Sequence, residues 1–79
     1  MPTVLYVNGY RFFFYSQEGN EPIHIHVTKA ESEAKLWLEP KLSPAYFVGF
    51  NARERREIIE LTKDNYTLLK HKWNEYFGK

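Results

Sequence analysis

Residues 21–27 read Glu21-Pro22-Ile23-His24-Ile25-His26-Val27, and the rest of the chain is organised around this stretch. Aliphatic and imidazole side chains alternate along it, which is typical of a strand with one buried face. The three aliphatic side chains would enter a core. His24 and His26 would project together from the opposite face, roughly 7 Å apart at the ~3.3 Å rise of a strand residue.

The alternation continues after a polar connection at residues 29–33, so residues 23–39 are predicted to form an antiparallel hairpin. Lys35 and Trp37 would then lie beside the histidines on the outward face. Pro40 lacks the amide hydrogen that a sheet ladder requires, so the second strand is expected to end before it. The inward face would gain three aliphatic residues, Ala34, Leu36 and Leu38.

Another hairpin is predicted at residues 3–15, where two segments rich in β-branched and aromatic residues flank Asn8-Gly9. An Asn-Gly pair favours a two-residue type I′ turn, which would pair Val7 with Tyr10 and so set the register of both strands. One face would carry Thr3, Leu5, Val7, Tyr10, Phe12 and Phe14, and the other Val4, Tyr6, Arg11, Phe13 and Tyr15.

The C-terminal part of the chain has a helical pattern. Apolar residues recur at spacings of three and four over residues 52–77, which predicts one long amphipathic helix. Asn51 followed by Glu54 resembles a capping box, and Gly78 fits a helix stop. The polar residues 63–65 favour a bend in this helix or a break into two.

Together these segments predict an α+β fold. A small antiparallel β-sheet is built from the two hairpins, 3–15 and 23–39, and the long, bent or broken helix 52–77 packs on one of its faces. Residues 45–48 would form either a short edge strand or an apolar arm over the core, since Pro44 argues against a central strand. The chain of 79 residues is expected to be a single domain, 1–79.

Composition restricts the classes of function. The chain has no cysteine, so disulfides and thiolate metal sites are excluded and a reducing cytoplasm is the expected location. The net charge is only +1, so attraction to nucleic acid would have to come from a local patch. No segment approaches the ~18 consecutive apolar residues of a membrane span, and neither a membrane association nor a cofactor is expected.

The predicted face opposite the helix is unusually aromatic. A sheet covered on one side normally presents polar residues to water, and an aromatic patch with polar neighbours usually marks a contact surface. The partner would be a small cognate protein or a second copy of the chain, or else single-stranded RNA stacked on the rings. Alternatively, residues 41–50 or the far end of the helix would cover the face as ordinary core. The face comprises Tyr6, Arg11, Phe13, Tyr15, His24, His26, Lys35 and Trp37.

The two histidines of this face also suggest RNA cleavage. One imidazole would act as general base and the other as general acid, with Lys35 or Arg11 stabilising the transition state. A metal site is not expected, because zinc generally requires three or four protein ligands and only Glu21 or Glu39 could join the histidines. The alternative is structural: one imidazole stacks on a neighbouring ring and the other is solvated or caps a loop. This alternative is preferred, so the chain is not expected to be an enzyme.

Several blocks of the sequence resemble DUF4160, a bacterial family of domains of unknown function. Genes of this family often lie beside another small domain of unknown function, and such pairs are suspected toxin–antitoxin modules. The resemblance therefore implies a protein-binding component of a two-protein module, with a small RNA-binding or RNA-cleaving toxin as the alternative. It brings no established catalytic residues. The blocks are residues 1–5, 9–16, 21–27, 34–40 and 73–78.

Overall fold

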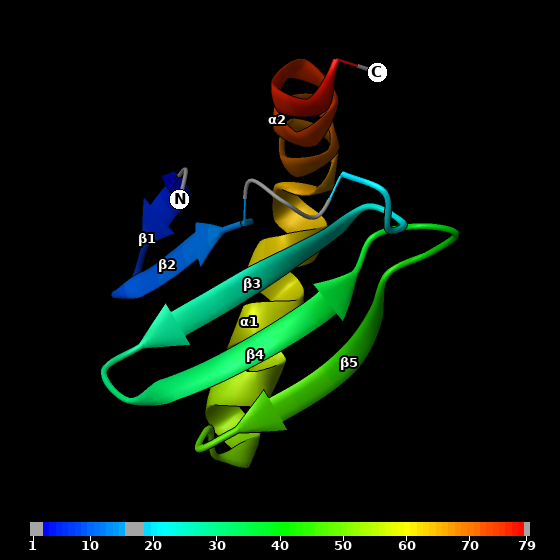
Figure 1. Cartoon of the computed structure of the whole chain (residues 1–79). Helices are drawn as coiled ribbons and strands as arrows, with labels where there is room; N and C mark the ends of the chain where they lie inside the picture. Colours follow the sequence, from blue (N-terminus) through cyan, green and yellow to red (C-terminus); the bar gives the residue numbers. More distant parts are fainter. Residues whose placement is uncertain (1–2, 16–18, 79) are drawn as a thin grey trace.

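In the described residues, five strands lie in one antiparallel sheet in the order of the chain, β1-β2-β3-β4-β5, and two helices follow them (Figure 1). The computed structural model describes residues 3–15 and 19–78; part of the predicted loop before residue 23, at 16–18, lies outside them. The predicted α+β class is confirmed. The elements are β1 (Thr3–Val7), β2 (Tyr10–Phe13), β3 (His24–Lys29), β4 (Ser32–Trp37), β5 (Ser43–Val48), α1 (Ala52–Asp64) and α2 (Tyr66–Phe77).

The first hairpin has the predicted turn and one irregularity. Asn8 and Gly9 have φ values of 53° and 83°, as a type I′ turn requires, and Val7 pairs with Tyr10. The register shifts between Thr3 and Leu5, so that Thr3 lies opposite Phe13. The predicted faces of Thr3 and Val4 are therefore wrong: Val4 packs against the core cluster, and Thr3 Oγ1 accepts a hydrogen bond of 2.9 Å from Arg11 Nε.

The second hairpin places its side chains as predicted but has a shorter connection. Ile25 pairs with Leu36, and both are fully buried. The ladder continues to the pair Lys29 and Ser32, so the connection has two residues, with Ala30 at φ 55°, rather than the predicted 29–33. The polar side chains of residues 29–33 do not alternate with apolar ones, which favours a loop, although the backbone groups at both ends of this segment pair in the ladder.

Residues 43–48 form the edge strand β5, one of the two predicted alternatives, and it begins two residues before the predicted 45. Pro44 lies within it and faces Leu36, next to a register shift between Lys35 and Leu36. An edge strand tolerates proline because one row of its backbone groups has no partner strand. The sheet therefore ends at β5.

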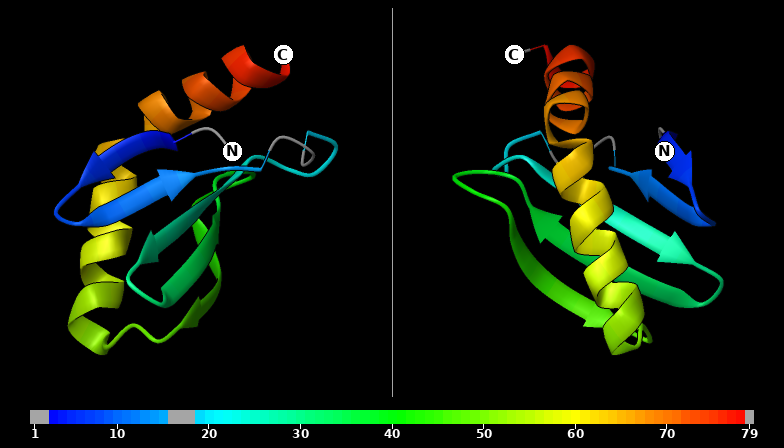
Figure 2. Two further views of the ribbon diagram at one scale, coloured as in Figure 1. Left: turned by 60° about the vertical axis from the view of Figure 1, so that its left-hand side comes forward. Right: turned by 180° about the vertical axis from the view of Figure 1, so that it is seen from behind.

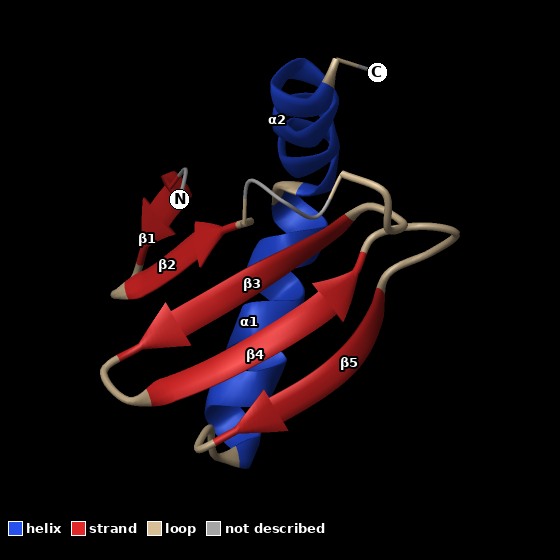
Figure 3. Cartoon of the chain, in the orientation of Figure 1, coloured by secondary structure: helices blue, strands red, loops and turns tan. Residues whose placement is uncertain are grey.

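The C-terminal helix is broken at Asn65, within the predicted segment, so the second form of the prediction is the one found (Figure 3). Asn65 turns both its backbone N–H and its side-chain Nδ2 toward the Leu61 carbonyl, at 3.1 Å and 2.8 Å. The capping box at Asn51 and Glu54 is present, and Gly78 ends α2 at φ 73°. Local sequence signals thus located all of these helix boundaries.

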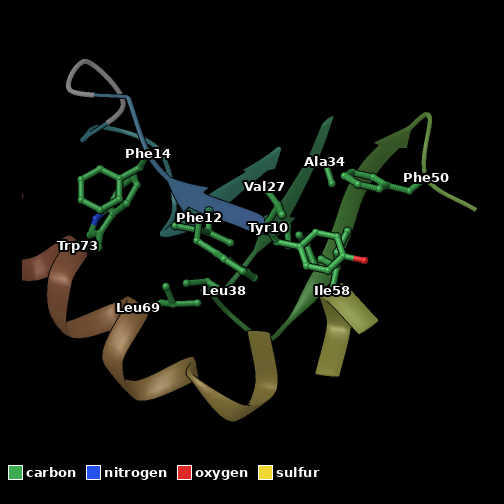
Figure 4. Close-up of a cluster of buried hydrophobic side chains, with 12 residues drawn as sticks. Tyr10, Phe12, Phe14, Val27, Ala34, Leu38, Phe50, Ile58, Leu69 and Trp73 are labelled. Atoms are coloured by element: carbon green, nitrogen blue, oxygen red, sulfur yellow. The ribbon is translucent and has the colours of Figure 1, made fainter. Parts of the chain in front are cut away.

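The helix α1 lies against one face of the sheet, and α2 continues past the sheet near the end of β2 and the start of β3 (Figure 2). Between them is the core, in which aromatic rings from β2 meet aliphatic side chains of the strands and helices (Figure 4). The hydroxyl of Tyr66 donates to the Leu38 carbonyl and joins the start of α2 to the end of β4. The buried cluster comprises Tyr10, Phe12, Phe14, Ile25, Val27, Ala34, Leu36, Leu38, Phe50, Ile58, Leu69 and Trp73.

Candidate functional site

The outer face of the sheet, turned away from the helices and toward the viewer in Figure 1, carries the predicted candidate residues. Cross-strand register arranges them in rows, because side chains directly opposite each other in a ladder share a face. The first row comprises Tyr6, Arg11, Thr28, Glu33 and Val48. The second comprises Phe13, His26, Lys35 and Tyr46, and the third His24, Trp37 and Ser43.

Aromatic rings in these rows form one connected cluster. His26 stacks on Phe13 at 5.5 Å between ring centroids, and the Tyr15 ring meets it edge-on at 4.8 Å. His24 lies 5.3 Å from His26 and 5.4 Å from Trp37. Such edge-to-face pairs contribute about 0.5–1.5 kcal/mol beyond their burial. The two histidines are therefore the centre of a ring cluster on the predicted face.

Both histidines are buried: His26 stacks on Phe13, as the structural alternative expects of one imidazole, but neither imidazole is solvated. His24 is 0% and His26 4% exposed. Trp73 of α2 reaches His24 with 4.9 Å between ring centroids, and His24 Nδ1 donates to the Pro22 carbonyl at 2.9 Å. Alternation determines which face a side chain joins, but its exposure depends on how far larger neighbours close over it.

Two cations lie on the rings of the outer face. The Arg11 guanidinium carbon is 4.4 Å from the centre of the Phe13 ring, and Lys35 Nζ is 4.4 Å from that of Trp37. Lys35 also pairs with Glu21, at 3.3 Å. Cation–π contacts of this kind contribute about 0.5–1 kcal/mol at exposed positions. Arg11 and Lys35 thus sit on the face as predicted, but each covers a ring.

The accessible part of the outer face lies toward its two edge strands. Tyr6 on β1 is 70% exposed, and Tyr46 and Val48 on β5 are 40% and 59% exposed. The sequence-based set omitted the β5 residues, together with Thr28 and Glu33. Thr28 and Glu33 continue the alternation of His26 and Lys35, which is the signal that could have found them. For the β5 residues the corresponding signal is the alternation of β5, but the register shift beside Leu36 hides which of its residues face outward.

The predicted acid–base residues are held in contacts within the fold. A general acid or base must lie within hydrogen-bond reach of the proton it transfers, and the side chain of His24 is completely enclosed. Lys35 is held by Glu21 and by the Trp37 ring. Within residues 3–15 and 19–78, no three His, Cys, Asp or Glu side chains gather as a set that could hold a metal ion.

Fold and surface together define a class: a small α+β domain with a five-stranded antiparallel meander, helices on one side and an aromatic outer face on the other. The chain belongs to the family described as Domain of unknown function (DUF4160), whose model matches residues 9–74. No curated protein and no solved structure matches the chain. In the described part of the chain, neither helix is long and apolar enough to cross a membrane.

Proposed function

We propose that this chain is a protein-binding component of a small two-protein module and that it contacts its partner through the outer face of the sheet. The observation that supports this best is the absence of a covering helix over that face in the described structure (Figure 1), together with the exposed tyrosines on it. Uncovered apolar surface with polar neighbours is characteristic of interfaces. A toxin–antitoxin pair is the form of module that the family resemblance suggests.

The composition of the exposed residues favours protein as the partner. Tyr6, Tyr15 and Tyr46 present rings that carry a polar hydroxyl, and Val48 adds aliphatic surface. Tyrosine is enriched at interfaces because it contributes large contact area with little loss of conformational entropy. The Tyr46 hydroxyl already donates to Glu33 Oε2 at 3.0 Å, which holds its ring on the face before binding.

Two observations weigh against single-stranded RNA on the same face. Bases stack on open rings, whereas Phe13 is 1% exposed and lies under the Arg11 guanidinium. The net charge of +1 also supplies little general attraction for phosphates. RNA-binding and RNA-cleaving activity therefore remains the alternative outcome of the test.

The test is binding to the protein encoded by the neighbouring gene, measured by co-purification and then by calorimetry. The double variant Tyr6→Ser and Tyr46→Ser should fold normally and weaken the complex by more than about fivefold, the size expected for loss of interface aromatics. Tyr76→Ser is the matched control, because Tyr76 is 49% exposed but lies on α2 rather than on the outer face.

Unchanged affinity in the double variant would show that the outer face is not the interface. Binding or cleavage of a single-stranded oligouridine by the wild-type chain, without protein binding, would favour the alternative. These outcomes separate the two functions because the wild-type chain is tested against both a protein and an RNA.

A further inference from the structure

The start of β3 and the end of β4 lie together at one end of the sheet (Figure 1). A groove lies there, beside the outer face. Its volume is about 320 Å³. Pockets for small molecules span roughly 300–1,000 Å³, so this groove suits one large side chain better than a cofactor. It is lined by Pro22, Trp37, Glu39, Pro40, Lys41 and Ser43.

The walls of the groove are tied to the rest of the fold. The Ile23 carbonyl accepts hydrogen bonds from the amides of Leu38 and Glu39, at 2.8 Å and 3.3 Å, which joins the start of β3 to the segment after β4. Pro22, which lines the groove, accepts a hydrogen bond from His24 Nδ1 at its carbonyl oxygen. A groove with fixed walls loses little conformational entropy when it is filled, and this favours binding.

Trp37 provides the aromatic wall of the groove. Its ring meets the His24 ring edge-on at 5.4 Å and lies under Lys35 Nζ, so its orientation is set by two neighbours. A fixed indole that lines the groove together with two prolines makes a site for an apolar group. Tryptophan is also among the residues most enriched at interface hot spots.

Charge at the rim of the groove is positive. Glu39 pairs with Lys70 of α2 at 3.4 Å, so its carboxylate is already compensated. Lys41 is exposed, and it forms no ion pair with any other residue that the structure describes. A ligand that brings a carboxylate to this rim would complement Lys41, whereas a cation would be repelled.

We propose that this groove receives a single large apolar side chain of the protein partner, next to a partner carboxylate that pairs with Lys41. The assignment rests on the proposed function and deepens it, because it locates the anchor of the interface. The groove lies beside the third row of the outer face and shares Trp37 and Ser43 with it. One docked surface would therefore cover both.

The first test measures partner affinity with charge-reversed variants. Lys41→Glu should weaken the complex about two- to fivefold, as expected for reversal of an exposed ion pair. Arg56→Glu is the control, because Arg56 is exposed on α1 behind the sheet and brings the same change of charge. Equal affinities for Lys41→Glu and the wild type would overturn the groove assignment while leaving the outer face intact as the interface.

The second test needs no partner and uses two indole probes of opposite charge, indole-3-acetate and tryptamine. The chain has two tryptophans, and Trp73 is 1% exposed, so its indole N–H signal in an ¹H–¹⁵N spectrum is an internal control. Indole-3-acetate should shift the Trp37 signal saturably, at about two- to fivefold lower concentration than tryptamine. Lys41→Glu should remove or reverse that preference.

The two tests fail in different ways. A wild-type chain that binds no partner protein but selects indole-3-acetate at Trp37 would contradict the proposed function and keep the groove. Absence of a Trp37 shift with both probes, or equal shifts with both, would overturn the groove as an anchor site for an acidic apolar group.

Discussion

Tyr10 is the residue that ties the first hairpin to α1. Its side chain is buried, and its hydroxyl donates to Glu57 Oε1 at 2.8 Å. Burial, the hydrogen bond to Glu57 and the nearby carboxylate charge together raise the pKa of Tyr10 from 10.0 to about 12. The folded state therefore favours the neutral phenol of Tyr10. The contribution of this neutral phenol to the free energy of unfolding is present in full below pH 10 and is lost as the pH rises through 12.

Tyr10→Phe should remove this contribution. Below pH 10 the variant should be less stable than the wild type by about 1 kcal/mol, the usual net value of a hydrogen bond. The difference between the two proteins should shrink as the pH rises from 10 to 12. Urea unfolding of both proteins across this range measures it, and the other tyrosines cancel in the comparison. A difference that does not change with pH would contradict the role assigned to Glu57.

His24 is expected to be structural rather than catalytic. It is fully buried among Trp37, His26 and Trp73, so His24→Ala should lower the free energy of unfolding by about 2–4 kcal/mol through lost packing. His71→Ala is the control, because the side chain of His71 is 67% exposed on α2, and it should change stability by less than about 0.5 kcal/mol. Denaturant midpoints of the two variants give the comparison. A stable His24→Ala variant that had lost an RNA-cleaving activity would support catalysis instead.

At the scale of elements, the turn between β1 and β2 and the connection from β5 to α1 each depend on a glycine, and the two glycines have similar backbone geometry. Gly9 and Gly49 have φ values of 83° and 88°, which side-chain-bearing residues rarely adopt. Their surroundings differ. A Cβ at Gly49 would lie 2.6 Å from Ser32 Oγ and 3.1 Å from its Cβ, whereas a Cβ at Gly9 would lie 3.4 Å from the flexible Lys29 side chain.

Gly9→Ala should therefore cost about 1–2 kcal/mol from backbone strain alone. Gly49→Ala should cost more, because the start of β4 must also move. Thermal or urea unfolding of the two variants isolates the steric term, since the backbone term is shared. Equal losses of unfolding free energy in the two variants would contradict this, because they would show that Ser32 moves aside without destabilising the fold.

At the scale of the whole molecule, Trp73 joins the end of the helical layer to the sheet. Its ring lies 5.3 Å from Phe14, after β2, and 4.9 Å from His24 at the start of β3. The strands β2 and β3 pair only through Arg11, Phe12 and Phe13, and Trp73 packs where their pairing has ended. The Trp73 side chain thus packs α2 both against the end of the sheet, at Phe14, and against the histidine cluster, at His24.

Trp73→Ala should cost about 3–5 kcal/mol. A protein of this length has a total stability of only about 4–12 kcal/mol, so the variant should melt more than about 15 °C below the wild type or fail to fold at 25 °C. Trp73→Phe, which keeps an aromatic ring, should lose less. Melting curves followed by circular dichroism measure both, and a small loss for the alanine variant would contradict this role.

The local features of the chain were predictable because they depend on neighbours in sequence. Asn8-Gly9 specifies a turn, alternation assigns Ile25 and His24 to opposite faces, and Asn51 with Glu54 starts a helix through hydrogen bonds within a few residues. Each of these choices involves atoms that the sequence already places close together. The two predicted hairpins, the helix boundaries and the outward side of His24, His26, Lys35 and Trp37 follow from them.

Tertiary packing decided what depends on distant residues. The bulge at Thr3 and Val4 and the register of β5 are set by the strands they pair with, and neither leaves a periodic signal. The burial of His24 follows from Trp73, almost fifty residues further along the chain, and no pattern around residue 24 reports it. The face of the sheet on which a side chain lies is determined locally, because it follows from the backbone geometry of the strand. The exposure of that side chain depends on every residue that packs around it, including residues distant in sequence.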